Sequence, residues 1–292
     1  MMKKQYQFGH VNIEVHMPEG MLIPENMQKF MCENDEADRI YEIEYAKSLA
    51  EIEQELRQSC PQAREIRREN LRVLTAPEKE CRILNFYGAD RPYGIVLEET
   101  GKPIRVWVDE EIRPMLIYDT IFVSLLALEK LMIQHDSLIL HSAYMLRGGK
   151  AILFSAPSET GKSTQADLWE RYRGTRTVNG DRSLLIREKD GWYAYGWPVC
   201  GSSKICHNES YPIQAIVMLH QSKTNEIVRI QGFEAVQKLM AQITINMWNT
   251  EYQIKAMDLI EEMIGDIPVY ELGCDISEEA VRCLEKELEK ID

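Results

Sequence analysis

The chain has 292 residues, of which 45% are hydrophobic, so it can bury one large core or two modest ones. Its formal net charge of −13 argues against nucleic acid or an anionic membrane as the main partner, because both attract basic surfaces. The seven cysteines are odd in number and include no Cys-x-x-Cys pair, which is typical of reduced thiols and does not favour a zinc site.

The N-terminus and the apolar runs predict a soluble protein of the cytoplasm. Residues 1–6 become polar after the first two and do not enter an apolar run, so we expect no signal peptide. The longest apolar stretch, 121–128, is bounded by Asp119 and Glu129 and is too short to span a bilayer.

The first predicted elements, up to residue 113, are short strands joined by polar connections. Alternating apolar residues predict strands at 11–15, 71–74 and 104–108. The stretch 41–57 is compatible with a charged helix, but 40–45 also alternates as a strand does, and both interpretations stay open. We expect residues 1–113 to form a small mixed α+β N-terminal module.

From Pro114 onward, helical and strand patterns alternate, and we expect residues 114–292 to form an α/β nucleotide-binding domain. The apolar pattern from Met115 to Gln134 predicts a helix of that length. Residues 138–146 and 151–155 predict two strands joined by a Gly-Gly turn. The later predicted elements are a helix at 164–170, a strand from 175 that ends in a turn at 181, a hairpin of 183–186 with 192–195, a strand at 214–219, helices at 233–248 and 251–264, a strand at 269–272 and a helix at 278–289.

Residues 156–164 read Ala-Pro-Ser-Glu-Thr-Gly-Lys-Ser-Thr and carry the most informative motif of the chain. Gly-Lys-Ser at this spacing, between an apolar strand and a helix, predicts a phosphate-binding loop of the Walker A type. The ammonium of Lys162 would reach the outer phosphate oxygens and Ser163 would ligate Mg²⁺, so we expect ATP and Mg²⁺ as cofactors. The residues expected to bind the nucleotide are Ser158, Glu159, Thr160, Gly161, Lys162, Ser163 and Thr164.

Two residues depart from the strict motif. Ala156 stands where glycine is usual, which requires a negative φ at this position. Glu159 brings a negative charge close to the expected phosphates. The alternative interpretation is an ordinary glycine-containing turn between a strand and a helix.

Phosphoryl transfer also needs an acidic residue near the metal and the nucleophile. Asp181 is the candidate, because it follows the next strand and ligands collect at strand ends on the loop side of a parallel sheet. A purely local role in a turn is the alternative. His141, within an apolar strand, is either a core residue or a functional one. The loop 196–204 would cover a substrate or only connect elements, while Arg182 and Lys204 are candidates for offsetting phosphate charge.

The order His141-Ser142, then Gly161-Lys162-Ser163, then Asp181-Arg182 resembles the catalytic domain of the HPr kinase/phosphorylase family, over roughly residues 135–225. The resemblance implies a phosphoenolpyruvate-carboxykinase-like P-loop core. It also implies catalytic roles for Asp181, His141 and Lys162, with the metal held by Ser163 and Asp181. The paired acid of that family is a single residue here, and the chain looks more like divergent HPr-kinase-like proteins associated with small modified peptides.

The sequence therefore predicts a kinase that transfers the γ-phosphoryl group of ATP to a Ser or Thr hydroxyl of a peptide or small protein. One alternative is a kinase of a small metabolite or a carboxykinase-type enzyme. Another is a nucleotide-sensing or peptide-binding protein without turnover. The expected partners are a nucleotide and the peptide or protein substrate, with no nucleic acid and no membrane, and the resemblance implies that a homo-oligomer can form.

Overall fold

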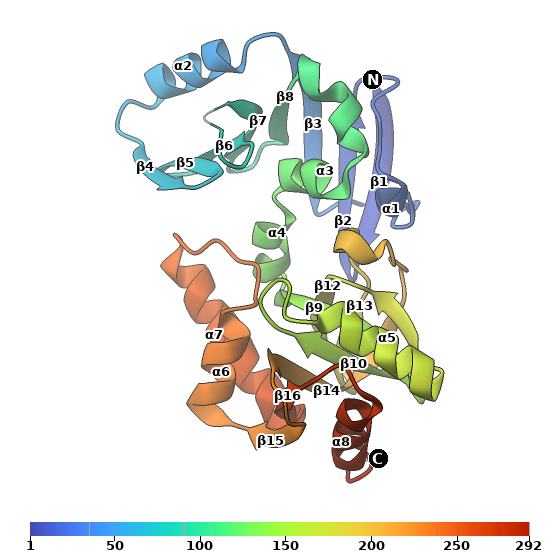
Figure 1. The fold of residues 1–292 in the computed structure, drawn as a ribbon. Coiled ribbons are helices and arrows are strands. Elements are labelled where there is room, and N and C mark those ends of the chain that lie inside the picture. Colours follow the sequence, from blue (N-terminus) through green and yellow to red (C-terminus); the bar gives the residue numbers. More distant parts are fainter. Residues whose placement is uncertain (35, 90, 292) are drawn as a thin grey trace. The chain divides into compact units, whose positions relative to one another are not determined.

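Two units make up the fold, Met1–Leu128 and Glu129–Asp292, in a computed structural model that describes residues 1–34, 36–89 and 91–291 (Figure 1). The domain boundary expected at residue 114 falls inside the first unit. Both units combine large mixed sheets with helices, so the expected α/β class is confirmed. No helix in the described part of the chain is long and apolar enough to cross a membrane.

The first unit is built on an eight-stranded sheet in the order β1-β2-β3-β8-β7-β6-β5-β4. The β2–β3 and β3–β8 pairs are parallel and the other pairs are antiparallel. Its strands are β1 (Met2–Phe8), β2 (Val11–Met17), β3 (Arg39–Ala46), β4 (Arg64–Arg68), β5 (Leu71–Ala76), β6 (Lys79–Asn85), β7 (Pro92–Glu99) and β8 (Ile104–Asp109). Its helices are α1 (Glu25–Gln28), α2 (Leu49–Ser59), η1 (Glu110–Ile117) and α3 (Asp119–Leu126), and α4 (Leu128–Gln134) follows at the boundary.

Residues 41–57, for which the sequence leaves both a helix and a strand open, contain part of each. β3 takes the first part, where apolar residues alternate, and α2 takes the second. Between them, the Ser48 side chain accepts a hydrogen bond from the backbone N–H of Glu51 at 3.3 Å and caps the helix. The change of apolar period from two to that of a helix therefore marks a real boundary.

The single helix predicted over 115–134 is wrong, because the segment is broken twice. η1 runs through Pro114 and ends at Ile117, and α3 ends where Ala127 takes a left-handed conformation with φ of 48°. Left-handed helix ends usually carry glycine, so an alanine there gives the sequence no stop signal. Leu125 and Leu126 of α3 are fully buried, so this end of the helix is packed into the core.

The second unit is built on strands in the order β10-β9-β12-β13-β14-β16-β15, with β11 paired to β9. β14 also pairs with β10 in parallel, which closes a ring of pairings through β9, β12 and β13. Its strands are β9 (Ser137–Arg147), β10 (Lys150–Ser155), β11 (Arg176–Asn179), β12 (Arg182–Glu188), β13 (Gly191–Tyr195), β14 (Ser210–Gln221), β15 (Glu226–Ile230) and β16 (Val269–Cys274). Its helices are α5 (Lys162–Arg173), η2 (Gly201–Ser203), α6 (Gly232–Met240), α7 (Thr250–Asp266) and α8 (Glu278–Leu288).

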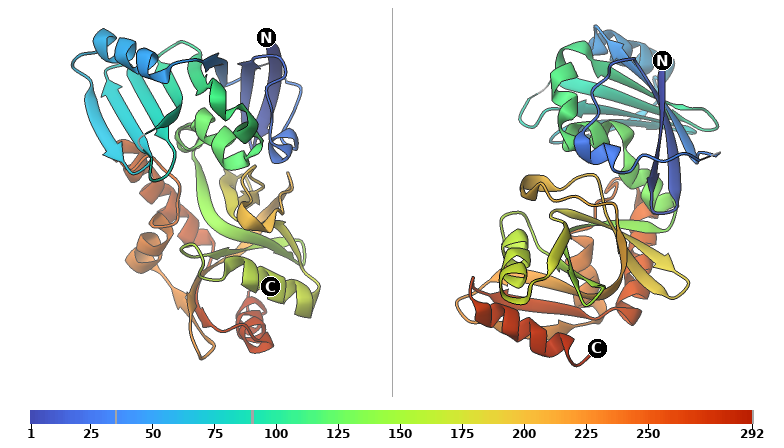
Figure 2. Two further views of the ribbon diagram at one scale, coloured as in Figure 1. Left: turned by 45° about the horizontal axis from the view of Figure 1, so that its top comes forward. Right: turned by 90° about the vertical axis from the view of Figure 1, so that its right-hand side faces the viewer.

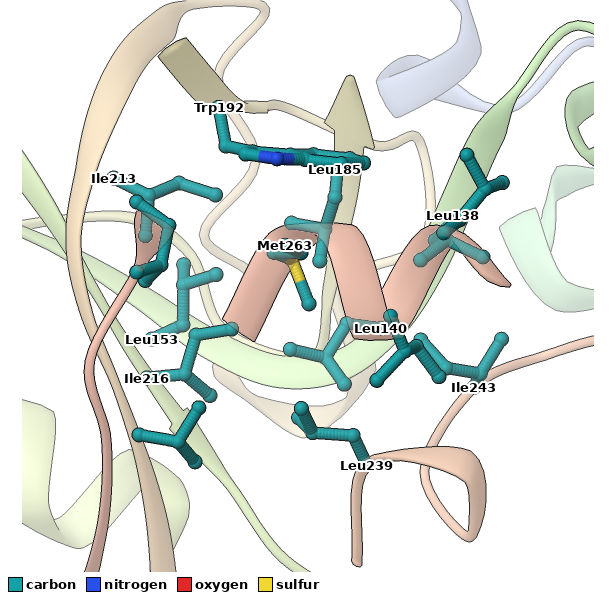
Figure 3. Close-up of a cluster of buried hydrophobic side chains, with 14 of the residues drawn as sticks. Leu138, Leu140, Leu153, Leu185, Trp192, Ile213, Ile216, Leu239, Ile243 and Met263 are labelled. Atoms are coloured by element: carbon teal, nitrogen blue, oxygen red, sulfur yellow. The ribbon is translucent and has the colours of Figure 1, made fainter. Parts of the chain in front are cut away.

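Helices cover both faces of this sheet (Figures 1 and 2). Along β10, Leu153 belongs to the cluster beneath α6 and α7, whereas Ile152 and Phe154 belong to the cluster beneath α5 and α8. This alternation is the period of two expected of a strand buried on both sides. Figure 3 shows Met263 of α7 among strand residues that include Leu185.

The helix predicted over 233–248 is correct only up to Met240. Beyond it the chain makes a turn at 241–242 and then bonds to β9: the backbone N–H of His141 donates to the carbonyl of Gln242 at 3.0 Å, and that of Thr244 donates to Ile139 at 2.8 Å. Ile243 is buried in the cluster beneath α6 and α7. Pairing with β9 thus replaces the last helical turns, and no local sequence signal predicts it.

Candidate functional site

The predicted phosphate loop connects β10 to α5. Gly161 begins α5 with φ of 118°, which glycine adopts readily, and Glu159 has a left-handed φ of 64°. Ala156 is not among the described residues with positive φ, so it meets the condition that the missing glycine sets. The backbone therefore turns through two left-handed positions before α5, one of which carries an acidic side chain instead of glycine.

Lys162 lies in the first turn of α5 and is 7% exposed. Its Nζ donates to the carbonyl oxygens of Ala156 at 3.0 Å and Pro157 at 3.2 Å, within its own loop. Burial lowers the pKa of Lys162 from its usual range, and the negative charge of Asp181 partly opposes this. The ammonium group of Lys162 is thus held against the backbone of its own loop, with Asp181 close enough to influence its pKa.

Asp181 lies between β11 and β12, two strands that pair with different parts of the same strand, β9. β11 pairs with the C-terminal part of β9 and β12 with its N-terminal part, both antiparallel, and Asp181 separates β11 from β12. The expectation that it ends a strand of a parallel sheet is therefore wrong. Ser142 of β9 joins the two sides, since its N–H donates to the Asp181 carbonyl at 2.9 Å and Ser142 pairs in register with Ser155 at the loop start.

Asn179 fixes the turn that presents Asp181, and the sequence analysis did not single it out. Its Oδ1 accepts hydrogen bonds from the N–H groups of Asp181 at 2.8 Å and Arg182 at 2.9 Å. Its Nδ2 donates to the carbonyl of Trp197 at 2.7 Å, and the side chain is fully buried. One amide thereby joins the acidic turn to the loop that follows β13.

The carboxylate of Asp181 lies between two basic groups. Its Oδ1 is 3.3 Å from Nε2 of His141, and its Oδ2 is 3.2 Å from Nε of Arg182, which also bonds to Thr244. Burial would raise the pKa of Asp181, but the hydrogen bond from His141 and the charge of Arg182 lower it below its ordinary value. Asp181 is therefore ionised at neutral pH.

The loop 196–204 packs against the acidic turn. A Cβ atom on Gly180 would lie 1.9 Å from Oγ of Ser203, and one on Gly201 would lie 3.1 Å from the Asp181 carboxyl. Such close approach is possible only with glycine at position 180. The loop 196–204 thus packs directly against the turn that carries the candidate catalytic residue.

These residues surround a pocket of about 310 Å³. Six of the seven residues expected to bind the nucleotide line it, all except Thr160, and so do His141 and Asp181. Ser202 also lines it, and only its place in a Gly- and Ser-rich loop could have indicated this. Arg182 and Lys204 are not among the lining residues, so direct contact with phosphate at the pocket wall is not supported for them.

Oxygen ligands for a hard cation are present at this pocket. No group of three or more His, Cys, Asp or Glu side chains suited to a metal occurs within residues 1–34, 36–89 and 91–291. Mg²⁺ at a nucleotide site, however, is usually held by one or two protein oxygens together with phosphates and water. The Ser163 hydroxyl and the ionised Asp181 carboxylate line the same pocket and fit that need.

Comparison with known proteins gives a family match and similarities to solved structures. The chain is similar to the HPr(Ser) kinase/phosphatase from Coxiella burnetii, with 11% identity over 52% of this chain and 97% of that chain and a TM-score of 0.32. A likeness at this level is too distant to support an argument about activity. No curated protein matches the chain. A family model described as "ScmC: SynChlorMet cassette protein ScmC" matches residues 108–289, more than half of the chain.

Proposed function

The chain belongs to the ScmC family of SynChlorMet cassette proteins, and we propose that it is an ATP-dependent kinase that phosphorylates a Ser or Thr hydroxyl of a peptide or small protein. One observation carries the proposal: Lys162 and Ser163 of the loop, and Asp181 and His141 from the neighbouring strands, line a single pocket. In this proposal the second unit is a divergent HPr-kinase-like domain with a phosphoenolpyruvate-carboxykinase-like core.

The loop and Lys162 would bind the phosphate chain of ATP. The N–H groups at the start of α5 point along the helix axis, where a helix terminus favours an anion. To reach the outer phosphate oxygens, the Lys162 ammonium exchanges its hydrogen bonds to Ala156 and Pro157 for bonds to phosphate. Mg²⁺, held by Ser163 and Asp181, would supply charge neutralisation at the transferred group.

Asp181 would position the acceptor hydroxyl and take its proton. As the hydroxyl oxygen bonds to the γ-phosphorus, the bond to the β-phosphate oxygen breaks, ADP leaves and the proton goes to the carboxylate. A lowered pKa makes Asp181 a weak base, which suits a loose transition state in which proton transfer is late. His141, 3.3 Å from the same carboxylate, would hold it in place.

The acceptor would enter beside Ser202, where the loop 196–204 meets the pocket. A backbone loop there suits an extended peptide better than a small acid, for which more lining cations would be needed. We further propose that the enzyme acts in the cytoplasm on a peptide of its own cassette, without nucleic acid or membrane, and that it can form a homo-oligomer.

The test is phosphorylation of a Ser/Thr peptide mixture with Mg²⁺ and ATP, scored by the mass of an added phosphate. Lys162→Ala and Asp181→Asn should each lower product formation by about 100-fold or more. The exposed Lys189→Ala and Asp167→Asn are matched controls and should act as the wild type does. If ATP binds in a Lys162-dependent manner and neither peptides nor small metabolites are phosphorylated, the kinase proposal fails and a nucleotide sensor takes its place.

A further inference from the structure

A second pocket, of about 390 Å³, opens on the other side of the phosphate loop. The C-terminal ends of β14 and β16 and the start of α5 form its wall. The residues that distinguish it from the first pocket include Gln165, Gln221, Ser222, Cys274, Asp275 and Ile276. None of them takes part in the proposed transfer.

The two pockets adjoin the same residues of the loop. Glu159, Gly161 and Thr164 line both of them, whereas Lys162, Ser163 and Asp181 line only the first. A ligand whose phosphates follow the loop therefore has its terminal phosphate beside Asp181, and its other end passes Thr164 into the second pocket. The order of the two pockets therefore sets which end of the bound molecule lies beside Asp181.

The charge of the second pocket excludes phosphate and favours donors. Its lining residues include Glu159 and Asp275 and no Lys, Arg or His. An anion would be repelled there, because like charges in a partly buried site disfavour each other. Hydroxyl and amine groups would be favoured, since carboxylates accept their hydrogen bonds.

Two acceptor side chains lie at this pocket. The Gln165 side chain is 3% exposed and donates to Cys274 Sγ at 3.1 Å and to the Asp275 carbonyl at 3.0 Å, and its Oε1 is buried without a partner among the described residues. The Asp275 carboxylate accepts on Oδ1 from Asn225 Nδ2 and the Ser277 N–H, each at 3.0 Å, and from the Ser277 hydroxyl at 2.5 Å, and none of these bonds occupies Oδ2. At the rim, Ile276 is 78% exposed and offers an apolar contact.

We propose that this second pocket binds the nucleoside of the nucleotide, with Asp275 accepting from ribose hydroxyl or base amine groups and Ile276 against the base. The inference rests on the proposed function, since it needs phosphates in the loop. Ribose recognition by a carboxylate is a common solution in nucleotide sites. The pocket would then add to the binding free energy of ATP without contacting the transferred phosphate.

The experiment is calorimetric titration of the full chain with Mg²⁺-ATP and, separately, with Mg²⁺-tripolyphosphate, which has the phosphates without the nucleoside. Gln221→Trp fills the pocket from an exposed position, and Ile276→Asp removes the apolar contact and adds a charge. Both should weaken ATP binding by about tenfold or more and change tripolyphosphate binding by less than about twofold. Lys223→Trp, exposed in the same turn and outside the pocket, is the control and should bind both ligands as the wild type does.

Three outcomes would overturn the inference. If both variants bind ATP as the wild type does while Lys162→Ala has lost it, the nucleoside lies elsewhere and the proposed function stands. If both variants lose ATP and tripolyphosphate equally, the substitutions act through the loop and not through a nucleoside pocket. If the wild type binds neither ligand, the phosphate site and the nucleoside pocket fail together.

Discussion

At the scale of the residue, Asn179 decides whether Asp181 is presented to the pocket. Asn179→Ala would leave two backbone N–H groups and the Trp197 carbonyl without these partners in a buried place. We expect the free energy of unfolding to fall by about 2 kcal/mol or more, with a loss of phosphorylation.

The measurement is denaturant unfolding beside Asn249→Ala, a helix-capping asparagine that also accepts two backbone bonds but is only half-buried. The Asn249→Ala control should lower the free energy of unfolding by about 1 kcal/mol. Equal losses in the two variants would show that Asn179 is an ordinary capping residue.

Gly180 sets how closely the loop 196–204 approaches the acidic turn. Gly180→Ala would place a methyl group 1.9 Å from Oγ and 2.3 Å from Cβ of Ser203, so the loop must move and both stability and activity should fall. Ser203→Gly removes the obstructing atoms, together with the hydrogen bond that the Ser203 hydroxyl donates to the Cys200 carbonyl and the one that it accepts from the Ile205 N–H. The double variant should therefore lose less than the sum of the single losses, as measured by unfolding and turnover; strict additivity would contradict the contact.

Part of this site could be predicted from the sequence. The motif around Lys162 has a strict spacing, and Asp181 and His141 indeed line the same pocket. Asn179 could not be found in this way, and Ser202 only as one member of the loop 196–204. The partner of Asn179 is eighteen residues away, at Trp197, and a polar residue before Gly-Asp resembles any local turn.

At the scale of the element, Arg173 connects the end of α5 to α8. Its guanidinium bonds Glu285 through two nitrogens, each at 2.7 Å, and Glu278 at 3.2 Å. Because the pair with Glu285 is bidentate and part-buried, Arg173→Ala should lower the free energy of unfolding by about 1 kcal/mol. The control Arg282→Ala, which pairs with Glu278 within its own helix, should cost less than about 0.5 kcal/mol.

The same pair gives a pH dependence. The hydrogen bond from Arg173 lowers the pKa of Glu285 below its ordinary 4.5, so the ionised carboxylate contributes stability that is present above pH 4.5 and is lost as the pH falls below it. The difference in melting temperature between wild type and Arg173→Ala should shrink in that range. A difference that stays constant down to pH 3 would exclude the linkage.

Elements with a strong local signal could be predicted, and those set by tertiary contacts could not. The hairpin of β9 and β10 has clear alternation and a Gly-Gly turn, and α8 has a regular apolar face. The break at Ala127 and the segment after Met240 depend on burial and on pairing with β9. Neither feature can be recognised from the composition or the apolar period of the sequence.

At the scale of the whole molecule, every residue that lines the two loop pockets belongs to the second unit, whereas the family match begins at residue 108. Mg²⁺-ATP should therefore slow amide exchange around the loop, the acidic turn and the segment after β16. The sheet of the first unit, β1 to β8, should exchange as before. Hydrogen exchange with mass detection would check this, and protection centred on β1 to β8 would locate the nucleotide elsewhere.

The two hydrogen bonds of Lys162 to carbonyl groups of its own loop have a consequence for selectivity. They occupy two of the three N–H donors of the ammonium, so an anion that takes more than one of these donors must compete with the carbonyl groups. A single phosphate makes few contacts with the loop, so it gains little binding free energy to offset the lost bonds to the carbonyl groups. A polyphosphate engages the ammonium and several N–H groups at once, as a multivalent ligand does. The loop would therefore stay indifferent to abundant inorganic phosphate and respond only to a chain of phosphates long enough to span it.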